Sequence, residues 1–272
     1  MYNGGVANIV VAMARTPFWT LVLVAVSIGP SIGSCVGLAG SSSVNGTLSH
    51  NVAFTIDSTN WAGYAVVGSA GSVSQVTGSW IQPSVTCTKS ATYLGLWDGI
   101  DGFNTKTVEQ AGTLAYCLHG NAHYSAWYEF YPKASVTIPS LTVTPGSTIS
   151  VTVTYNASAA DFAITVTVGN VSYTHVGTSI HAKLATAECI DERPMVNGHL
   201  THLADFGNVT FGADSTSTIG CGATINGITG SFGNFSSVLA INMIDKSRHV
   251  LSSTSSLSTD GSSFTGTWVA PS

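Results

Sequence analysis

Residues 147–155 read STISVTVTY, and this stretch decides the fold class. Apolar residues alternate with hydroxyl residues at a period of two, so one face of the segment is apolar and the other is polar. Such alternation is typical of a β-strand whose two faces meet different environments. Almost no stretch of the chain shows helical periodicity, and the sequence therefore predicts an all-β protein.

The neighbouring segments carry the same signals. Residues 162–168 and 171–175 flank Gly169-Asn170, a pair that favours a two-residue hairpin turn. The C-terminal SSFTGTWVAPS indicates a closing strand, and residues 187–192 are expected on a short strand or turn. Many short strands separated by Gly, Pro and Asn favour an antiparallel β-sandwich with few or no helices.

Charge is scarce in this chain. Only 8% of its 272 residues are Asp, Glu, Lys or Arg, and the net charge is −5. A surface of neutral hydroxyls changes little when the pH falls, which suits life at low pH but equally suits any extracellular β protein rich in Ser and Thr. The eight Lys and Arg residues are scattered and form no basic patch, so nucleic-acid binding is not expected.

The N-terminus has the pattern of an export signal. Arg15 precedes an apolar stretch at residues 18–28, and Gly37-Leu38-Ala39 is an acceptable cleavage site. The apolar run is short for a membrane span and ends at Pro30, so no stable membrane association is expected. The predicted organisation is a signal peptide at 1–39, a linker or short propeptide at 40–54 and one secreted domain at 55–272.

The cysteines suit an oxidising compartment. Cys35 is expected to leave with the signal peptide, and the other four could form two disulfides with three possible pairings. These four are Cys87, Cys117, Cys189 and Cys221. The chain has no CxxC pair and no HExxH pattern, so neither a metal nor another cofactor is expected.

Seven of the thirteen acidic residues fall in two windows, residues 98–129 and 188–192, and the first window is rich in aromatic residues. Aromatic walls exclude water and raise carboxyl pKa values, so these windows predict a cleft with acids at its base. The residues alone leave other interpretations open. The aromatics could fill the core while the acids cap turns, the domain could bind carbohydrate without catalysis, or Glu129 and Glu192 could serve a glycosidase.

Ordered motifs extend across residues 58–270. They read STNWAGY (58–64), GSWIQP (78–83), WDGIDG (97–102), EQAGT (109–113), AWYEFYP (126–132), AECIDERP (187–194) and LADFGNVTF (203–211). In this order they resemble the glutamic peptidases, the eqolisin family. The resemblance implies a sandwich of two bent sheets (concanavalin-like) and a catalytic pair that corresponds to Gln110 and Glu192.

The resemblance also implies an activity, which is acid endopeptidase action by a monomer on polypeptide substrates. Glu192 would act as the general base on water, and Gln110 would stabilise the oxyanion. Amide donation from Gln110 to Glu192 would favour the ionised carboxylate, and on this ground an acidic optimum is expected. Residues expected to support the pair or line the substrate site are Trp61, Trp97, Asp101, Gly112, Trp127, Glu129, Tyr131 and Glu188.

Three residues depart from the motifs of the family. Asp98 is expected either near the cleft or facing solvent, and Cys189 either narrows a wall or joins a disulfide. Asp191 directly precedes Glu192. Because neighbours on a strand point to opposite faces, Asp191 is expected to point away from Glu192.

Overall fold

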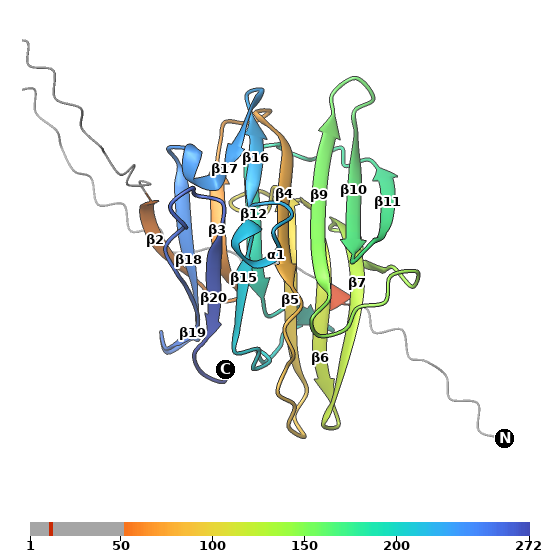
Figure 1. The fold of residues 1–272 in the computed structure, drawn as a ribbon, viewed down its shortest axis with the longest axis vertical. Helices are drawn as coiled ribbons and strands as arrows, with labels where there is room; N and C mark the ends of the chain where they lie inside the picture. The colour runs from red at the N-terminus through yellow and green to blue at the C-terminus, as the bar shows by residue number, and fades with distance from the viewer. Residues whose placement is uncertain (1–10, 13–51) are drawn as a thin grey trace, which may run out of the picture.

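The computed structural model describes residues 11–12 and 52–272 (Figure 1). Nearly all of the predicted signal peptide and most of the predicted linker lie outside the described residues. Strand β2 (Val52–Ser58) takes up the last residues of that predicted linker. Among the described residues, no helix combines the length and apolar character needed to cross a bilayer.

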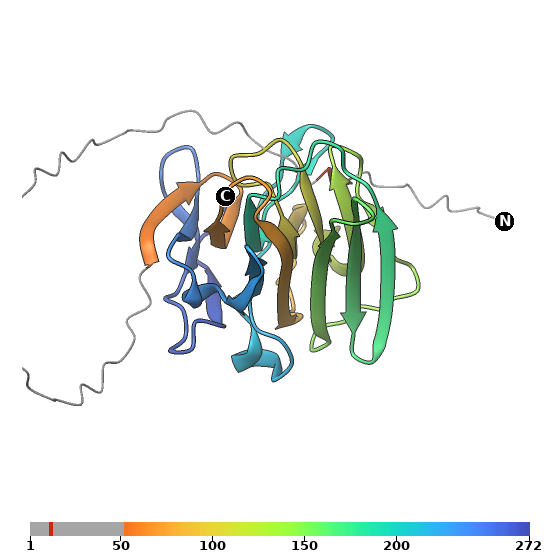
Figure 2. The same cartoon turned by 90° about the horizontal axis from the view of Figure 1, so that it is seen from above.

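The strands form two layers (Figures 1 and 2). In hydrogen-bonded order, the first layer contains β7 (Asn121–Tyr131), β6 (Val108–Leu118), β5 (Thr92–Ile100), β12 (Thr186–Glu192), β3 (Trp61–Val67), β18 (Val238–Ile244) and β2. Short strand β8 (Val136–Thr137) pairs with β7. All of these pairs are antiparallel except β18 with β2, which run parallel.

The second layer starts with β11 (Val171–Gly177), β10 (Asp161–Val168), β9 (Thr148–Asn156) and β4 (Val73–Ile81). On its other edge, β4 pairs with β15 (Asn208–Phe211) and β16 (Gly222–Ile225), which lead to β20 (Phe264–Trp268) and β17 (Ile228–Ser231). Strand β19 (Val250–Thr254) pairs with both β18 and β20, so it joins the two layers along one edge.

The remaining elements are short. Strands β1 (Val11–Ala12), β13 (Met195–Val196) and β14 (His199–Leu200) form a small separate sheet. The helical elements in the described chain are α1 (Ala213–Thr216) and a single 3-10 turn (Phe232–Asn234). The all-β prediction is therefore confirmed, including the strand over residues 148–156 and the hairpin in which Val168 pairs with Val171.

The central strands of the first layer are buried on both faces. A large apolar cluster fills the space between the layers and includes Trp80, Phe162 and Phe211. A smaller cluster, built around Trp61 and Trp97, lies on the face of the first layer that points away from the second layer. Every residue of β12 is buried, so the acids on this strand are held in a low-dielectric setting on whichever face they point to.

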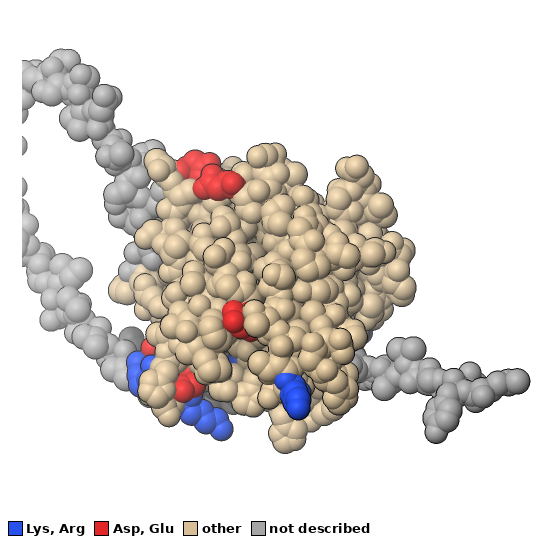
Figure 3. All heavy atoms as spheres, turned by 60° about the horizontal axis from the view of Figure 1, so that its bottom comes forward, with Lys and Arg blue, Asp and Glu red and all other residues tan. Residues whose placement is uncertain are grey.

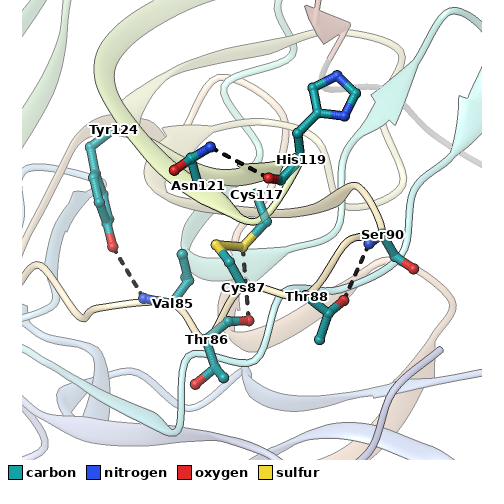
Figure 4. The surroundings of a disulfide bond; sticks show 9 residues. All are labelled: Val85, Thr86, Cys87, Thr88, Ser90, Cys117, His119, Asn121 and Tyr124. Carbon is teal, nitrogen blue, oxygen red and sulfur yellow. Dashed lines mark hydrogen bonds between the residues drawn. A yellow bond between two sulfur atoms is a disulfide. The ribbon is translucent and has the colours of Figure 1, made fainter.

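One disulfide joins Cys87, in the segment after β4, to Cys117 near the end of β6 (Figure 4). The backbone N–H of Val85 beside it donates a 3.1 Å hydrogen bond to the hydroxyl of Tyr124. Cys189 and Cys221 are buried thiols. Of the two disulfides that the four cysteines could form, this structure contains one, because the sulfurs of Cys189 and Cys221 are not bonded to each other.

Charged side chains are sparse on the surface, and Figure 3 shows one face formed almost entirely of uncharged residues. The ion pairs found among the described residues are Arg248–Asp57 and His249–Asp245, both at 3.0 Å and both largely in contact with water. Exposed pairs of this kind contribute little to stability. Most of the fold is therefore held by apolar packing and strand hydrogen bonds.

Candidate active site

Strand register brings the predicted site residues onto one face of the first layer. Gln110 on β6 pairs with Glu129 on β7 and with Gly99 on β5, and Gly99 pairs in turn with Glu188 on β12. Side chains on neighbouring strands that are directly paired point to the same face. Gln110, Glu129 and Glu188 therefore share the face that carries the smaller apolar cluster.

A second row of paired residues lies beside the first. Trp127 on β7 pairs with Gly112, and Gly112 pairs with Trp97 on β5. Glu192 is at the end of β12, where it pairs with Gly95 on β5 and with Trp61 on β3. The period-two alternation along β12 places Glu188 and Glu192 on the same side of the sheet.

The Glu192 carboxyl group is held by two N–H donors. The indole Nε1 of Trp97 donates to Oε2 at 2.8 Å, and the amide Nδ2 of Asn60 donates to Oε1 at 3.1 Å. The rings of Trp61 and Trp97 meet edge to face with centroids 5.0 Å apart. Burial raises the pKa of Glu192 to about 7. The N–H groups of Trp97 and Asn60 oppose that rise, and the nearby N–H group of Trp61 does so without direct hydrogen-bond geometry.

Asn60 is the residue at this site that sequence reasoning missed. The hydroxyl of Ser58 donates to Asn60 Oδ1 at 3.3 Å, which leaves the Asn60 amide nitrogen facing Glu192. The signal was present in the STNWAGY motif, where Asn60 directly precedes Trp61.

Gln110 is also buried, at 1% exposure, but its amide partner differs from the expectation. Gln110 Nε2 donates to Glu129 Oε2 at 2.6 Å. Gln110 Oε1 accepts no hydrogen bond from any described residue. The prediction that the Gln110 amide keeps Glu192 ionised is therefore wrong for this structure, because the nearest carboxylate to that amide is Glu129.

Trp97 extends toward both predicted catalytic residues. A side-chain carbon added to Gly99 would lie 3.0 Å from Cβ of Gln110 and 3.1 Å from Cζ3 of Trp97. The six-membered ring of this indole is therefore close to Gln110, while its nitrogen bonds to Glu192. One aromatic side chain thus connects the two ends of the site.

Trp61, Trp127 and Tyr131 belong to the aromatic cluster around the site, and Tyr131 is the most accessible of the three. Gly112 has a different role. A Cβ at this position would lie 1.9 Å from the carbonyl oxygen of Leu96, so the close approach of β5 and β6 allows no side chain here. Gly112 therefore brings the strands of Trp97 and Gln110 together.

Asp101 and Glu188 support the surrounding loops. The Asp101 carboxylate accepts backbone hydrogen bonds from Lys183, Leu184 and Ala185 at 2.5, 2.8 and 2.9 Å. Glu188 Oε1 accepts one from the backbone of Phe103 at 3.2 Å, and burial raises the pKa of Glu188 well above its ordinary value. Among the described contacts, neither acid bonds to Gln110 or Glu192.

With this geometry established, comparison with known proteins identifies the family. Residues 59–265 match the Peptidase A4 family. The chain belongs to the peptidase A4 family. It is 32% identical over 186 residues to Aspergillopepsin-2 from Aspergillus niger, a match that covers 59% of this chain and 65% of that protein.

A second relative is Scytalidopepsin B from Scytalidium lignicola, which is 34% identical over 101 residues, or 37% of this chain and 36% of that protein. The chain thus spans less than two thirds of the length of either A4 relative. The fold also agrees with solved structures. Scytalido-glutamic peptidase with a transition state analog inhibitor has a TM-score of 0.65 at 22% identity, covering 78% of this chain and 98% of that chain.

Aspergilloglutamic peptidase from Aspergillus niger has a TM-score of 0.55 at 29% identity, covering 65% of this chain and 99% of that chain. These matches agree with the all-β sandwich that the sequence predicts.

The glutamates of this A4 chain are unusually placed. The sequence contains four, and all are at most 1% exposed. Glu109 directly precedes Gln110 on β6 and pairs with Ile100 and Phe130, so its side chain points to the face opposite Gln110. Burial raises the pKa of Glu109 to about 8. The folded protein therefore keeps protons that the unfolded chain would lose at neutral pH.

The residues that depart from the family motifs point away from the site. Asp98 is fully buried on the interlayer face, so the expectation that it lies near the cleft or faces solvent is wrong. Asp191 accepts a 2.6 Å hydrogen bond from the hydroxyl of Ser252 on β19, so it points away from Glu192 as predicted. Strand alternation thus separates the extra acids from the predicted catalytic pair.

Proposed function

We propose that this A4 family member is an acid endopeptidase that hydrolyses peptide bonds with a water molecule held by Gln110 and Glu192. The observation that carries this proposal is the buried Glu192 carboxyl group, which receives N–H donors from Trp97 and Asn60 and shares one face of the sheet with Gln110. A buried carboxyl group beside a neutral amide can transfer protons and stabilise a developing oxyanion without a metal ion.

The raised pKa of Glu192 decides the form in which it reacts. With a pKa of about 7, Glu192 is mainly neutral across the acidic range. One oxygen of the neutral carboxyl group accepts a proton from water as general base, while the other oxygen passes its own proton to the carbonyl oxygen of the peptide. The product is a tetrahedral diol, and Glu192 again carries one proton.

The second half of the reaction uses the same group. Glu192 gives its proton to the leaving nitrogen and takes one back from a hydroxyl of the diol as the C–N bond breaks. Gln110 Oε1, which accepts no hydrogen bond from a described residue, orients the attacking water. One N–H of Gln110 is held by Glu129, and the other N–H stabilises charge on the peptide oxygen.

The aromatic side chains suit an extended peptide. The indole nitrogens of Trp61 and Trp127 are buried and have no hydrogen-bond acceptor among the described residues. A peptide carbonyl could satisfy such donors, and the rings offer apolar surface for side chains. A related structure, SCP-B of the eqolisin family, holds the tripeptide Ala-Ile-His.

The test is cleavage of acid-denatured casein or haemoglobin by the purified protein. We expect Gln110→Ala and Glu192→Gln each to reduce the rate by at least about a thousandfold, because each removes a group that acts in the transition state. The matched controls are Gln75→Ala and Asp161→Asn, which alter an amide on β4 and a carboxylate on β10. Circular dichroism should show the same β structure in all four variants.

Full activity of either Gln110→Ala or Glu192→Gln would overturn the assignment. Wild-type cleavage should resist both pepstatin and chelators, since the proposed reaction uses neither an aspartic pair nor a metal. Assays against oligosaccharides should show no hydrolysis. Sugar cleavage that depends on Glu129 and Glu192 would instead favour the glycosidase interpretation.

We also propose that the protein is exported from the cell. Residues 1–39 act as a signal peptide, residues 40–54 as a linker or short propeptide, and the enzyme works outside the cell as a monomer on polypeptides. The Cys87–Cys117 disulfide supports an oxidising compartment. N-terminal sequencing of the mature protein from culture medium tests this, and a first residue before position 30 would contradict it.

A further inference from the structure

A cluster of three buried side chains lies between the two layers, away from the proposed active site. Asp98 comes from β5, Cys189 from β12, and Cys221 from the residue just before β16. One oxygen or sulfur atom from each side chain lies within 4.8 Å of the other two, and all three residues are 0% exposed. The cluster therefore brings two sulfurs and a carboxyl group from both layers to one point.

The Asp98 carboxyl group has no partner that explains its burial. Neither of its oxygens accepts a hydrogen bond from a described residue, and no Lys or Arg in the described chain forms an ion pair with it. Burial raises the pKa of Asp98 to about 8, and the nearby Cys189 thiol is the only described side chain that opposes this rise. Buried carboxylates are normally paired with a cation or bound to a metal ion.

The opposite strand leaves room for this group. A Cβ on Gly78 of β4 would lie 2.4 and 2.5 Å from the two oxygens of Asp98, so only glycine leaves the space that the carboxyl group occupies. The carbonyl oxygen of Thr77, the residue before Gly78, lies 3.8 Å from Sγ of Cys189. A backbone oxygen is thus present beside the two sulfurs and the carboxyl group.

We propose that Asp98, Cys189 and Cys221 form a binding site for a thiophilic metal ion of the zinc class, which ties the two layers together. Two thiolates and one carboxylate are a ligand set that zinc accepts in tetrahedral geometry, with a water or a backbone carbonyl in the fourth position. The ion would satisfy the Asp98 oxygens and hold two thiols that the disulfide pattern leaves unused.

A pocket on the second layer borders the cluster. A pocket of about 200 Å³ is lined by Cys221 together with residues that include Thr77, Gly220, Ser231 and Ser262. The pocket is formed by β4, β16 and β17, and it lies outside the aromatic cluster around Glu192.

The metal site and the proposed peptidase site are independent in this geometry. Cys189 and Glu192 lie on opposite faces of β12, because three positions along a strand reverse the direction of the side chain. The metal would therefore act on stability and would take no part in peptide hydrolysis. Loss of metal binding and loss of peptidase activity are separate outcomes.

Cobalt(II) alone is the first probe. Because the thiols must lose their protons to bind a metal, the purified full chain is titrated with Co²⁺ near pH 7, and the absorbance is recorded. We expect a thiolate-to-cobalt charge-transfer band that saturates at one ion per chain. Zn²⁺ should abolish this band by displacement and should raise the unfolding temperature.

Variants assign the ligands. Cys189→Ser and Cys221→Ser should abolish the band, and Asp98→Asn should weaken binding by at least about tenfold because one first-sphere ligand becomes neutral. The control Asp161→Asn should bind as the wild type does. If a cysteine variant does not fold, the wild-type spectrum and the Asp98→Asn titration still decide the question.

Three results would overturn the proposal. The wild type could show no thiolate band and no thermal shift with Zn²⁺. Peptide mapping of the unreduced protein could find Cys189 and Cys221 joined in a disulfide. Cobalt binding could also survive unchanged in Cys221→Ser, which would assign it to an adventitious surface site.

Discussion

The indole nitrogen of Trp97 donates a 2.8 Å hydrogen bond to Oε2 of Glu192, although the two residues lie 95 positions apart in the sequence. Both side chains are buried, and the same indole ring extends over Gly99 toward Gln110. This one contact links the aromatic window to the acidic window. It also sets part of the protonation behaviour of Glu192, and the first prediction follows from it.

Trp97→Phe should keep the ring and remove the N–H donor. Because the donor opposes the effect of burial, its loss raises the pKa of Glu192 further above 7. We expect kcat/KM to fall by about 2- to 10-fold at acid pH, since a hydrogen bond to a neutral carboxyl group contributes about 0.5–1.5 kcal/mol.

The pH profile distinguishes this from simple misfolding. In the wild type, kcat/KM should fall as the pH rises through about 7, where Glu192 loses its proton. In Trp97→Phe that descending limb should move to higher pH. The control is Trp80→Phe, because Trp80 is equally buried and its Nε1 has no acceptor among the described residues. An unmoved limb in Trp97→Phe would contradict the prediction.

Asn60→Ala tests the second donor to Glu192. Its amide makes a 3.1 Å hydrogen bond to Oε1, so its loss should lower kcat/KM by about tenfold and shift the descending limb upward as well. Ser58→Ala should have a smaller effect in the same direction, because Ser58 does not bond to Glu192 and acts through the Asn60 amide and the backbone N–H groups of Asn60 and Trp61.

Asn156→Ala is the matched control, since this exposed asparagine caps a turn on the second layer. Steady-state kinetics on one peptide substrate rank the three variants. Wild-type kcat/KM and an unmoved descending limb in the Asn60 variant would show that Asn60 does not act through its amide.

Glu109→Gln should change how stability depends on pH. The unfolded chain loses the Glu109 proton near the ordinary pKa of 4.5, whereas the folded protein keeps it up to about 8. The contribution of Glu109 to the free energy of unfolding is therefore highest below pH 4.5. It falls as the pH rises from 4.5 to 8, by at most about 1.4 kcal/mol per pH unit.

Glutamine keeps the shape and has no proton to lose, so the variant should lose stability less steeply with pH than the wild type. Urea unfolding at about pH 4 and about pH 7 gives the change in the free energy of unfolding with pH for the wild type and for the variant. Asp161→Asn, on β10, should keep the wild-type slope. Parallel slopes for the wild type and Glu109→Gln would refute the claim that Glu109 folds in its neutral form.

Asp101→Asn should loosen the segment at residues 183–185. The carboxylate accepts three backbone N–H groups there, and an amide can accept at only one oxygen. We expect a loss of about 1–3 kcal/mol in the free energy of unfolding.

Hydrogen exchange gives the specific readout for that variant. The amides of Lys183, Leu184 and Ala185 should exchange faster, while amides in β9 and β10 stay protected. Unchanged protection at residues 183–185 would show that another group holds this segment.

The sequence alone was sufficient for the fold class and for the family resemblance. Period-two alternation in STISVTVTY follows directly from the pleat of a strand, and the Gly169-Asn170 turn dictates a local hairpin. The ordered motifs predicted Gln110 and Glu192 as the catalytic pair, and the structure places these residues on β6 and β12. Alternation along β12 then required Asp191 to point away from Glu192, a relationship that depends only on neighbouring residues.

Tertiary structure alone decided which groups meet across strands. Asn60 reaches Glu192 over 132 sequence positions, and Gln110 donates to Glu129 in place of Glu192. The Asp98, Cys189 and Cys221 cluster likewise needs the register of β5 and β12 and the close approach of β4 at Gly78. Periodicity along a strand fixes the face to which a side chain points. Only the pairing and stacking of strands fix the neighbours of that side chain, because residues distant in sequence meet there. Those neighbours and the depth of burial then set the hydrogen bonds and the pKa values of these acids.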